Sequence, residues 1–146
     1  MKIYLIRHGE TIGDVENRYG GDYDDHLTEK GKKQAIELSK KLQDNDIEII
    51  FSSPIFRAKE TAEILQKQIK CRLKFVNSLR ERNFFGFLTG MNKDDAKKKH
   101  PEDVEKLKHF KNTIKDAETY ENFKERIEIS LNKILKSKCK TIAILT

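Results

Sequence analysis

The sequence of 146 residues is long enough for one domain around a single hydrophobic core, and neither a linker nor an internal repeat divides it. Hydrophobic residues make up 36% of the chain and charged residues 37%, but the apolar residues are clustered, which argues against disorder. The 30 basic and 24 acidic residues give a net charge of +6. This charge suits a small anionic substrate, and no motif of a nucleic-acid-binding domain accompanies it.

The apolar stretches are far shorter than the roughly 20 residues that a membrane-spanning helix needs, and the N-terminal run is too short for a secretion signal. We therefore expect a cytoplasmic protein that binds neither membranes nor nucleic acid. Cys71 and Cys139 have the spacing of neither a zinc site nor a disulfide framework. Both are predicted to be reduced and buried.

The first third of the chain predicts one strand followed by one helix. Residues 2–6 are a short apolar run rich in β-forming residues, and a polar segment with glycine follows, so we expect a strand that leads into a functional loop. Thr28 is a candidate N-cap for a helix that continues to about Gln43. Apolar residues recur along this helix at helical spacing, at Ala35, Leu38 and Leu42.

The next segment repeats the order of strand and helix. Residues 47–51 predict a strand that is covered on both faces, and Ser53 and Pro54 are the expected N-cap and first residue of the following helix. A third strand is predicted over residues 73–76. The helix between these strands carries one apolar stripe, formed by Ala58, Ala62, Leu65 and Ile69.

The pattern weakens over residues 77–118, where glycines mark a loop and Pro101 separates two short helical pieces. We interpret this segment as an insertion beside the functional site. An amphipathic helix that begins at Thr119 and a buried strand over residues 141–145 complete the chain. The apolar positions of that helix are Phe123, Ile127, Leu131 and Ile134. The prediction is a single α/β domain with a mainly parallel sheet.

Three residues at the end of the first strand are candidates for chemistry. Arg7, His8 and Gly9 follow this strand directly, and in α/β sheets ligands bind beyond the carboxyl ends of the strands. An arginine can hold a phosphate group while the neighbouring histidine supplies a nitrogen nucleophile. Gly9 allows a close approach of the backbone, and Thr11 offers a hydroxyl group.

The motif Arg-His-Gly-Glu-Thr at residues 7–11 resembles the histidine phosphatase superfamily, which is also called phosphoglycerate mutase-like. Four further blocks are similar to that family and occur in its order, so that the resemblance covers nearly the whole chain. They are Asp25 to Ala35 with Gly31 and Gln34, Ser52 to Ala62 with Arg57, Leu79 to Arg82 followed by Gly86 and Gly90, and Glu118-Thr119 with Arg126.

The resemblance implies a phosphoglycerate mutase-like three-layer α/β sandwich and a covalent phosphoryl transfer. His8 would be the nucleophile that becomes phosphohistidine, and Arg7 and Arg57 would bind the phosphate group. The physical chemistry of the residues agrees, because two nearby guanidinium groups disfavour the imidazolium form of His8. The resemblance implies neither a metal nor a cofactor.

Glu81 resembles the general acid of the family, which protonates the leaving oxygen and then activates water. The family places a glycine four residues after this acid, whereas Gly86 is five residues after Glu81. One residue is therefore inserted, which affects the aim of the carboxylate. The alternative is an exposed loop acid that pairs with Arg80 or Arg82.

Asp14 is assigned to the phosphate pocket together with Arg7 and Arg57, and it stands where many members of the family carry asparagine. A carboxylate repels phosphate instead of donating a hydrogen bond to it, so contact with Arg18 is an alternative for Asp14. The nearby acids Asp22, Asp24 and Asp25 could bind a cation, but solvated loop acids are the favoured interpretation.

The family carries a second catalytic histidine after the strand that corresponds to residues 141–145, and this sequence ends at Thr146. His26, His100 and His109 do not lie in the His-Gly context of that second catalytic histidine, so we assign its role to none of them. We therefore expect residues 1–146 to be one histidine phosphatase domain that lacks C-terminal elements of the family and is inactive by itself.

The resemblance favours a phosphomonoester hydrolase that acts on a small phosphorylated metabolite. Two alternatives stay open: a phosphoryl transfer of the phosphoglycerate mutase type, and an inactive module that binds phosphate or a phosphoprotein. Residues 84–116 are expected to recognise the leaving group, but they contain no motif that identifies it. Oligomeric state is equally open.

Overall fold

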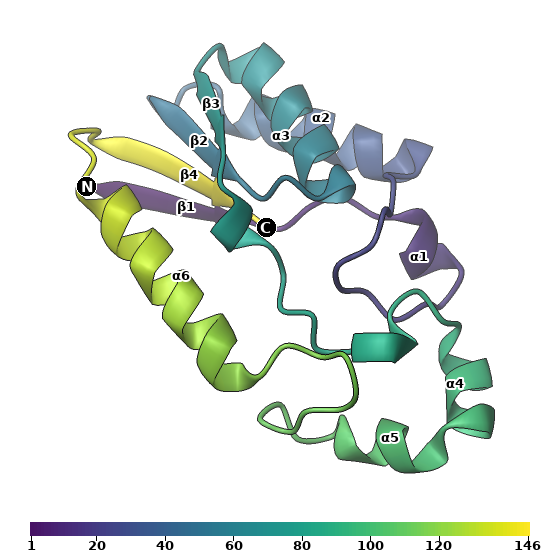
Figure 1. Ribbon diagram of the computed structural model, residues 1–146. Coiled ribbons are helices and arrows are strands. Elements are labelled where there is room, and N and C mark those ends of the chain that lie inside the picture. The colour runs from purple at the N-terminus through teal and green to yellow at the C-terminus, as the bar shows by residue number, and fades with distance from the viewer.

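Four parallel strands form the centre of the computed structural model, which describes residues 1–146 (Figure 1). The strand order is β1-β4-β2-β3. Leu145 pairs with Ile6 on one side and Ser52 on the other, so the carboxyl ends of three strands meet at one edge. The strands are β1 (Lys2–Ile6), β2 (Ile49–Ser52), β3 (Arg72–Phe75) and β4 (Thr141–Leu145).

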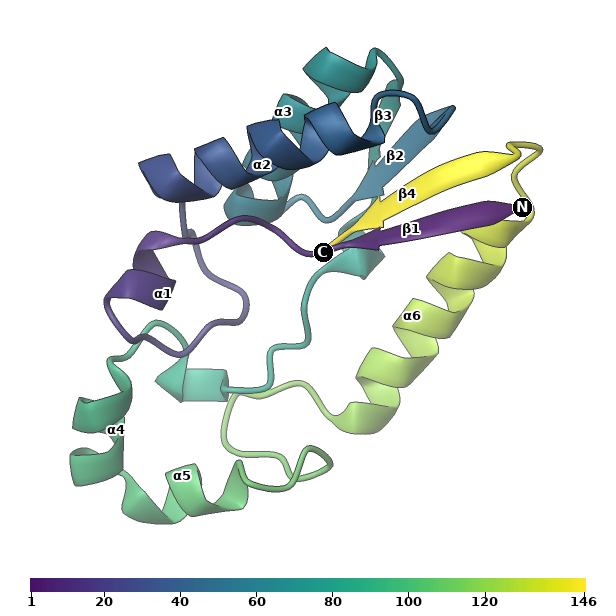
Figure 2. The ribbon, with the colours of Figure 1, turned by 180° about the vertical axis from the view of Figure 1, so that it is seen from behind.

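Helices cover both faces of this sheet and give the expected three layers. Helices α2 (Glu29–Leu42) and α3 (Phe56–Ile69) lie on one face, and α6 (Tyr120–Leu135) lies on the other (Figures 1 and 2). The fold class is therefore confirmed as α/β with a parallel sheet. The predicted bounds of α2 and the predicted start of α6 are correct, and Thr28 and Thr119 are the N-caps of these helices.

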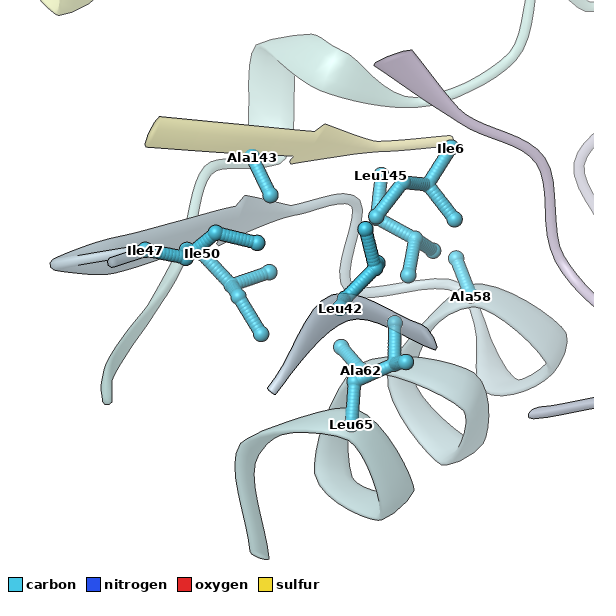
Figure 3. Close-up of a cluster of buried hydrophobic side chains, with 9 residues drawn as sticks. All are labelled: Ile6, Leu42, Ile47, Ile50, Ala58, Ala62, Leu65, Ala143 and Leu145. Atoms are coloured by element: carbon cyan, nitrogen blue, oxygen red, sulfur yellow. The ribbon is translucent and has the colours of Figure 1, made fainter. Parts of the chain in front are cut away.

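Alternation along the strands builds a separate core on each face, because successive side chains of a strand point to opposite sides. On the α2 and α3 side, strand residues pack against the small side chains of the α3 stripe (Figure 3). This cluster consists of Ile6, Leu42, Ile47, Ile50, Ala58, Ala62, Leu65, Ala143 and Leu145. The core on the α6 side contains Ile49, Phe51, Leu79, Ile134, Ile142 and Ile144.

The expected start of α3 is wrong. Ser53 donates its backbone N–H to the carbonyl oxygen of Leu145 at 2.9 Å, which extends the pairing of β2 with β4 by one residue. Ser53 is held by the sheet, so the chain turns into the helix only after Pro54, and Ile55 is the N-cap. Arg57 is consequently the second residue of α3, within its first turn.

A small helical region separates β3 from α6. It comprises η1 (Asn77–Leu79), η2 (Gly86–Leu88), α4 (Lys93–Lys99) and α5 (Pro101–Lys106), and it confirms the two short helices on either side of Pro101. Leu88, Ala96 and Ile114 form its own buried cluster. The short helix α1 (Ile12–Val15), which the sequence did not predict, precedes α2.

Cys71 and Cys139 are free, but both are half-buried, so the expectation of full burial is wrong. Cys71 follows the last turn of α3, and Cys139 lies in the connection before β4. Both cysteines therefore lie at the ends of secondary-structure elements, where neighbouring elements cover them only in part. None of the helices has the length and hydrophobicity to cross a lipid bilayer.

Candidate active site

A cleft of about 410 Å³ lies where the loops after β1, β3 and β4 meet the first turn of α3. Its lining is almost entirely polar. The lining residues are Arg7, His8, Thr11, Asp14, Arg18, Gly20, Asp25, Arg57, Glu81, Phe85, Lys93 and Thr146. All five site residues predicted from the sequence, His8, Glu81, Arg7, Arg57 and Asp14, are therefore brought together in one cleft.

His8 is held so that one ring nitrogen remains free for chemistry. Its Nδ1 atom lies 2.8 Å from the carbonyl oxygen of Gly9. Because a carbonyl oxygen only accepts hydrogen bonds, Nδ1 carries the proton and Nε2 keeps its lone pair. The backbone N–H of His8 donates to the carbonyl oxygen of Thr146 at 3.3 Å, which ties the loop to the end of β4.

Burial lowers the pKa of His8 below its ordinary value of 6.5, because an imidazolium ion loses hydration in the cleft. The charges of Arg57 and Arg7 lower this pKa further. The hydrogen bond to Gly9 and the carboxylate of Asp14 act in the opposite direction without reversing the shift. Neutral His8, the form with a nucleophilic nitrogen, therefore predominates at neutral pH.

Two glycines allow the His8 loop to cross the start of α2. A Cβ atom on Gly9 would lie 2.4 Å from the carbonyl oxygen of Gly31, and one on Gly31 would lie 2.1 Å from the carbonyl oxygen of Glu10. No side chain fits at either position. The backbone N–H of Gly9 also donates to Oγ1 of Thr61 on α3 at 3.2 Å, so the loop is fixed from two helices.

Arg57 presents a buried cation with an unused donor. The residue is 3% exposed, and its Nη2 atom donates to the carbonyl oxygen of Gly21 at 2.7 Å and to Oε2 of Glu81 at 2.6 Å. Its Nη1 atom is buried and has no hydrogen-bond partner. A buried guanidinium nitrogen without an acceptor is costly, and an anionic oxygen in the cleft would satisfy it.

Glu81 reaches the cleft despite the inserted residue before Gly86. Its carboxylate pairs with Arg57 and not with either neighbouring arginine. Arg80 pairs with Asp22, and Arg82 donates to backbone carbonyl oxygens of the insertion. The placement fits a group that can act on a phosphate ester bound to Arg57, and it does not fit the alternative of a loop acid paired with Arg80 or Arg82.

Asp14 lines the cleft, but its carboxylate is already engaged. Its Oδ2 atom accepts the backbone N–H of Thr11 at 3.0 Å, and Oγ1 of Thr11 accepts the backbone N–H of Asp14 at 3.0 Å. These reciprocal bonds cap α1. Arg18 pairs with Glu16, so the alternative of a contact between Asp14 and Arg18 is not observed.

The acidic residues of the entrance loop, which is residues 16–28 between α1 and α2, do not behave alike. Asp24 is exposed, but Asp25 is 6% exposed and accepts the backbone N–H of Gly13 at 3.0 Å, so the expectation of a solvated Asp25 is wrong. The neighbouring Tyr23 hydroxyl is buried, and burial, followed by the charge of Asp25, raises the pKa of Tyr23 to about 12. Asp25 therefore serves the structure of the loop.

Several residues of the cleft were not predicted from the sequence. Arg18, Phe85 and Lys93 belong to separate segments, and only the docking of the insertion against the entrance loop brings them to the cleft. An isolated bridge between Arg18 and Asn92 joins these two segments. No local motif could have identified these residues. The cleft lining does not include His26, His100 or His109.

The family model of the histidine phosphatase superfamily (branch 1) matches residues 3–146. The chain belongs to this superfamily. Among curated members, the "Probable phosphoglycerate mutase GpmB" of Salmonella choleraesuis is 40% identical over 81 residues, which are 56% of this chain and 38% of that protein. The match thus extends over less than half of the length of this curated relative.

Similar solved structures cover the chain almost completely. The alpha-ribazole phosphatase of Shigella flexneri superposes with a TM-score of 0.89 at 25% identity, over 100% of this chain and 73% of that one. YhfR of Bacillus stearothermophilus superposes with a TM-score of 0.86 at 30% identity, over 99% of this chain and 72% of that one. A phosphoglycerate mutase of Bacillus anthracis superposes with a TM-score of 0.80 at 29% identity, over 99% of this chain and 73% of that one. These similarities confirm the phosphoglycerate mutase-like fold.

Proposed function

We propose that the protein is a phosphomonoester hydrolase that acts through a phosphohistidine at His8. One observation carries the proposal: His8, whose Nε2 atom keeps its lone pair, and Arg57, whose Nη1 atom has no hydrogen-bond partner, line the same polar cleft. A nucleophile and a vacant donor for a phosphoryl oxygen are the two parts that this chemistry requires. Arg7 adds a second positive charge at the same cleft.

In the first step the lone pair of His8 Nε2 attacks phosphorus, and the bond between phosphorus and the ester oxygen breaks. Glu81, in its protonated form, gives its proton to the departing oxygen, so the leaving group departs as an alcohol. Arg7 and Arg57 stabilise the charge on the remaining phosphoryl oxygens. The products of this step are phosphohistidine and the carboxylate form of Glu81.

In the second step water attacks the phosphohistidine. The carboxylate of Glu81 takes a proton from the water as the new oxygen-phosphorus bond forms and the nitrogen-phosphorus bond breaks. Inorganic phosphate is released, and both His8 and Glu81 return to their starting forms. The pair between Glu81 and Arg57, at 2.6 Å, places this carboxylate beside the proposed phosphate-binding residue, which suits its role in the second step.

The proposed substrate is a small phosphorylated metabolite. The cleft volume of about 410 Å³ is at the lower end of the range for small-molecule sites, and its lining is charged. The phosphatase named among the similar structures supports hydrolysis. A cytoplasmic location is part of this proposal and is supported by the two free cysteines, which are typical of a reducing compartment.

Phosphoryl transfer of the mutase type is the second candidate, and it is favoured by the names of GpmB and of the Bacillus anthracis structure. A mutase would use the same His8 but return the phosphoryl group to an organic hydroxyl instead of water. Release of inorganic phosphate from phosphoglycerate, measured beside its isomerisation, separates the two. Isomerisation without net release of phosphate would replace the proposed hydrolysis.

The test of the proposal is turnover by the purified full-length protein on p-nitrophenyl phosphate and on a panel of phosphorylated metabolites. His8→Ala is expected to abolish turnover, whereas the control His109→Ala, which changes an exposed histidine outside the cleft, is expected to retain it. Turnover that survives His8→Ala would remove His8 from the mechanism. Binding of inorganic phosphate without any turnover would favour the inactive binding module.

A further inference from the structure

The loop that carries Glu81 has no helix or strand of its own. Residues 80–85 link η1 to η2 and run from the sheet towards the small helical region (Figure 1). The side chain of Glu81 is 46% exposed, so packing alone does not fix its direction. Its aim at Arg57 therefore depends on what holds the backbone of this loop.

Arg126 of α6 holds that backbone, and all of its donors are engaged. Its Nε and Nη2 atoms donate to the two carboxylate oxygens of Glu118, at 2.5 and 2.7 Å. Its Nη1 atom donates to the carbonyl oxygens of Ser78 and Arg80, each at 2.8 Å. Its Nη2 atom donates to the carbonyl oxygen of Glu81 at 3.3 Å. Every N–H of the guanidinium group thus has an acceptor.

The carbonyl groups of Arg80 and Glu81 belong to the two peptide groups that flank the Cα atom of Glu81. Fixing both peptides fixes the direction in which the side chain leaves the backbone. A lysine at position 126 could pair with Glu118, but its single ammonium group lacks the planar fork that reaches three carbonyl oxygens and a carboxylate together. The geometry is therefore specific to arginine.

The rest of α6 fixes Arg126 in turn. Thr119 caps the helix by accepting the backbone N–H of Asn122 at 3.2 Å. One helical turn beyond Arg126, Ser130 donates its hydroxyl to the hydroxyl of Ser78. The side chains of Arg126 and Glu118 are 25% and 19% exposed and lie in a polar recess beside the cleft of His8, where they do not line that cleft.

We propose that Arg126, oriented by Glu118, is a positioning residue that aims Glu81 at the leaving oxygen. The proposal rests on the hydrolysis proposed above. It predicts a particular kinetic signature, because a general acid matters for a poor leaving group and hardly matters for one that departs without a proton. Loss of the positioning should therefore affect alkyl phosphates much more than p-nitrophenyl phosphate.

The test compares kcat/KM for glycerol phosphate and p-nitrophenyl phosphate in the full-length protein with Arg126→Lys, Arg126→Gln and Glu81→Gln. In kcat/KM for glycerol phosphate, we expect Glu81→Gln to lose about 10²–10⁴-fold and the two Arg126 variants about 10- to 100-fold. In kcat/KM for p-nitrophenyl phosphate, which reports only the attack of His8 on the ester, each variant should lose no more than about threefold; kcat falls further, because the attack of water also uses Glu81. In the Glu81→Gln background, Arg126→Lys should add no further loss, because both changes remove the same function. Lys124→Gln, an exposed position on the same helix, is the matched control for both substrates.

Equal losses on both substrates would show that Arg126 supports the fold and would overturn the proposal, as would additive losses in the double variant. If Arg126→Gln fails to fold, Arg126→Lys and Glu118→Gln carry the same comparison, and an unchanged kcat/KM for p-nitrophenyl phosphate reports their folding. If Glu81→Gln itself shows no selective loss, the acid role in the proposed function is wrong and the positioning role falls with it. If the unaltered protein turns over neither ester, the proposed hydrolysis itself fails.

Discussion

Replacement of Arg57 by alanine removes the buried cation of the cleft. The substitution deletes the hydrogen bonds to Gly21 and to Glu81. It also removes the Nη1 donor, which has no hydrogen-bond partner in the protein. Because Arg57 is 3% exposed, water does not screen its charge as it screens a surface arginine. Its interaction with a phosphoryl group should therefore be strong in the transition state.

The expected loss is about 2–4 kcal/mol of transition-state stabilisation, or about 10²–10³ in kcat/KM, as for removal of a preorganised donor at a developing oxyanion. The loss of folding free energy should be smaller. The carbonyl oxygen of Gly21 loses one hydrogen bond, which contributes about 1 kcal/mol, and the carboxylate of Glu81 is exposed enough to be hydrated instead. The rate effect thus exceeds what partial unfolding could produce.

Steady-state assays on p-nitrophenyl phosphate should be paired with urea unfolding of the same preparations. Arg72→Ala on β3 is the matched control, because Arg72 is an exposed arginine outside the cleft. Its kcat/KM should stay within about threefold of the unaltered protein, the scale of a change with no lost transition-state contact. A change of similar size in Arg57→Ala would refute the assignment of Arg57 to the phosphate site.

Three further predictions follow from burial and close contact. The pKa of His8 is lowered, so activity should persist as the pH falls below 6.5. The stability that neutral His8 contributes should be present above pH 6.5 and lost as the pH falls below it. A loss of kcat/KM on the acid side that begins above pH 6.5 would contradict this prediction. Gly31→Ala should lower the free energy of unfolding by about 1–3 kcal/mol, because the new Cβ would lie 2.1 Å from the carbonyl oxygen of Glu10. Leu65→Ala, at a fully buried position, should lower the free energy of unfolding by about 2–5 kcal/mol. Leu135→Ala, at a position that is 48% exposed, should lower it by less than about 1 kcal/mol. Equal effects of the two substitutions in a urea titration would contradict the described core.

Much of the fold could be predicted because its elements carry clear patterns. Strands β1 and β4 have the predicted bounds, since each is a short run of β-forming residues. The N-cap of α2 is correct because Thr28 accepts a hydrogen bond from the backbone of Gly31, the local interaction on which that prediction depends. Local chemistry was sufficient at these positions.

Other features depend on contacts between distant segments. Ser53 and Pro54 look like the start of a helix, but pairing with Leu145 keeps Ser53 in the sheet. The same limit applies to the amphipathic pattern of α6, where Ile134 is buried while Phe123 is only half-buried, because the sheet covers the C-terminal part of the helix. Periodicity shows which face of a helix is apolar, but it does not show how far the neighbouring element extends.

The candidate site divides in the same way. His8 and Arg57 could be predicted from short motifs at the ends of a strand and at the start of a helix, where the backbone alone determines their position. The contribution of Lys93 to the cleft and of Arg126 to the Glu81 loop could not, because each depends on the path of a long irregular segment. Sequence patterns therefore predict the residues proposed to contact the phosphate group, whereas the surrounding residues can be identified only from the tertiary structure.

The central claim is that His8 carries the phosphoryl group during turnover. The direct measurement is mass spectrometry of the full-length protein after rapid mixing with p-nitrophenyl phosphate and an alkaline quench, which preserves phosphohistidine. We predict one phosphoryl group on the peptide that contains His8, formed at least as fast as steady-state turnover and absent from His8→Ala. Phosphate release without this adduct, or with the phosphoryl group on another residue, would contradict the account.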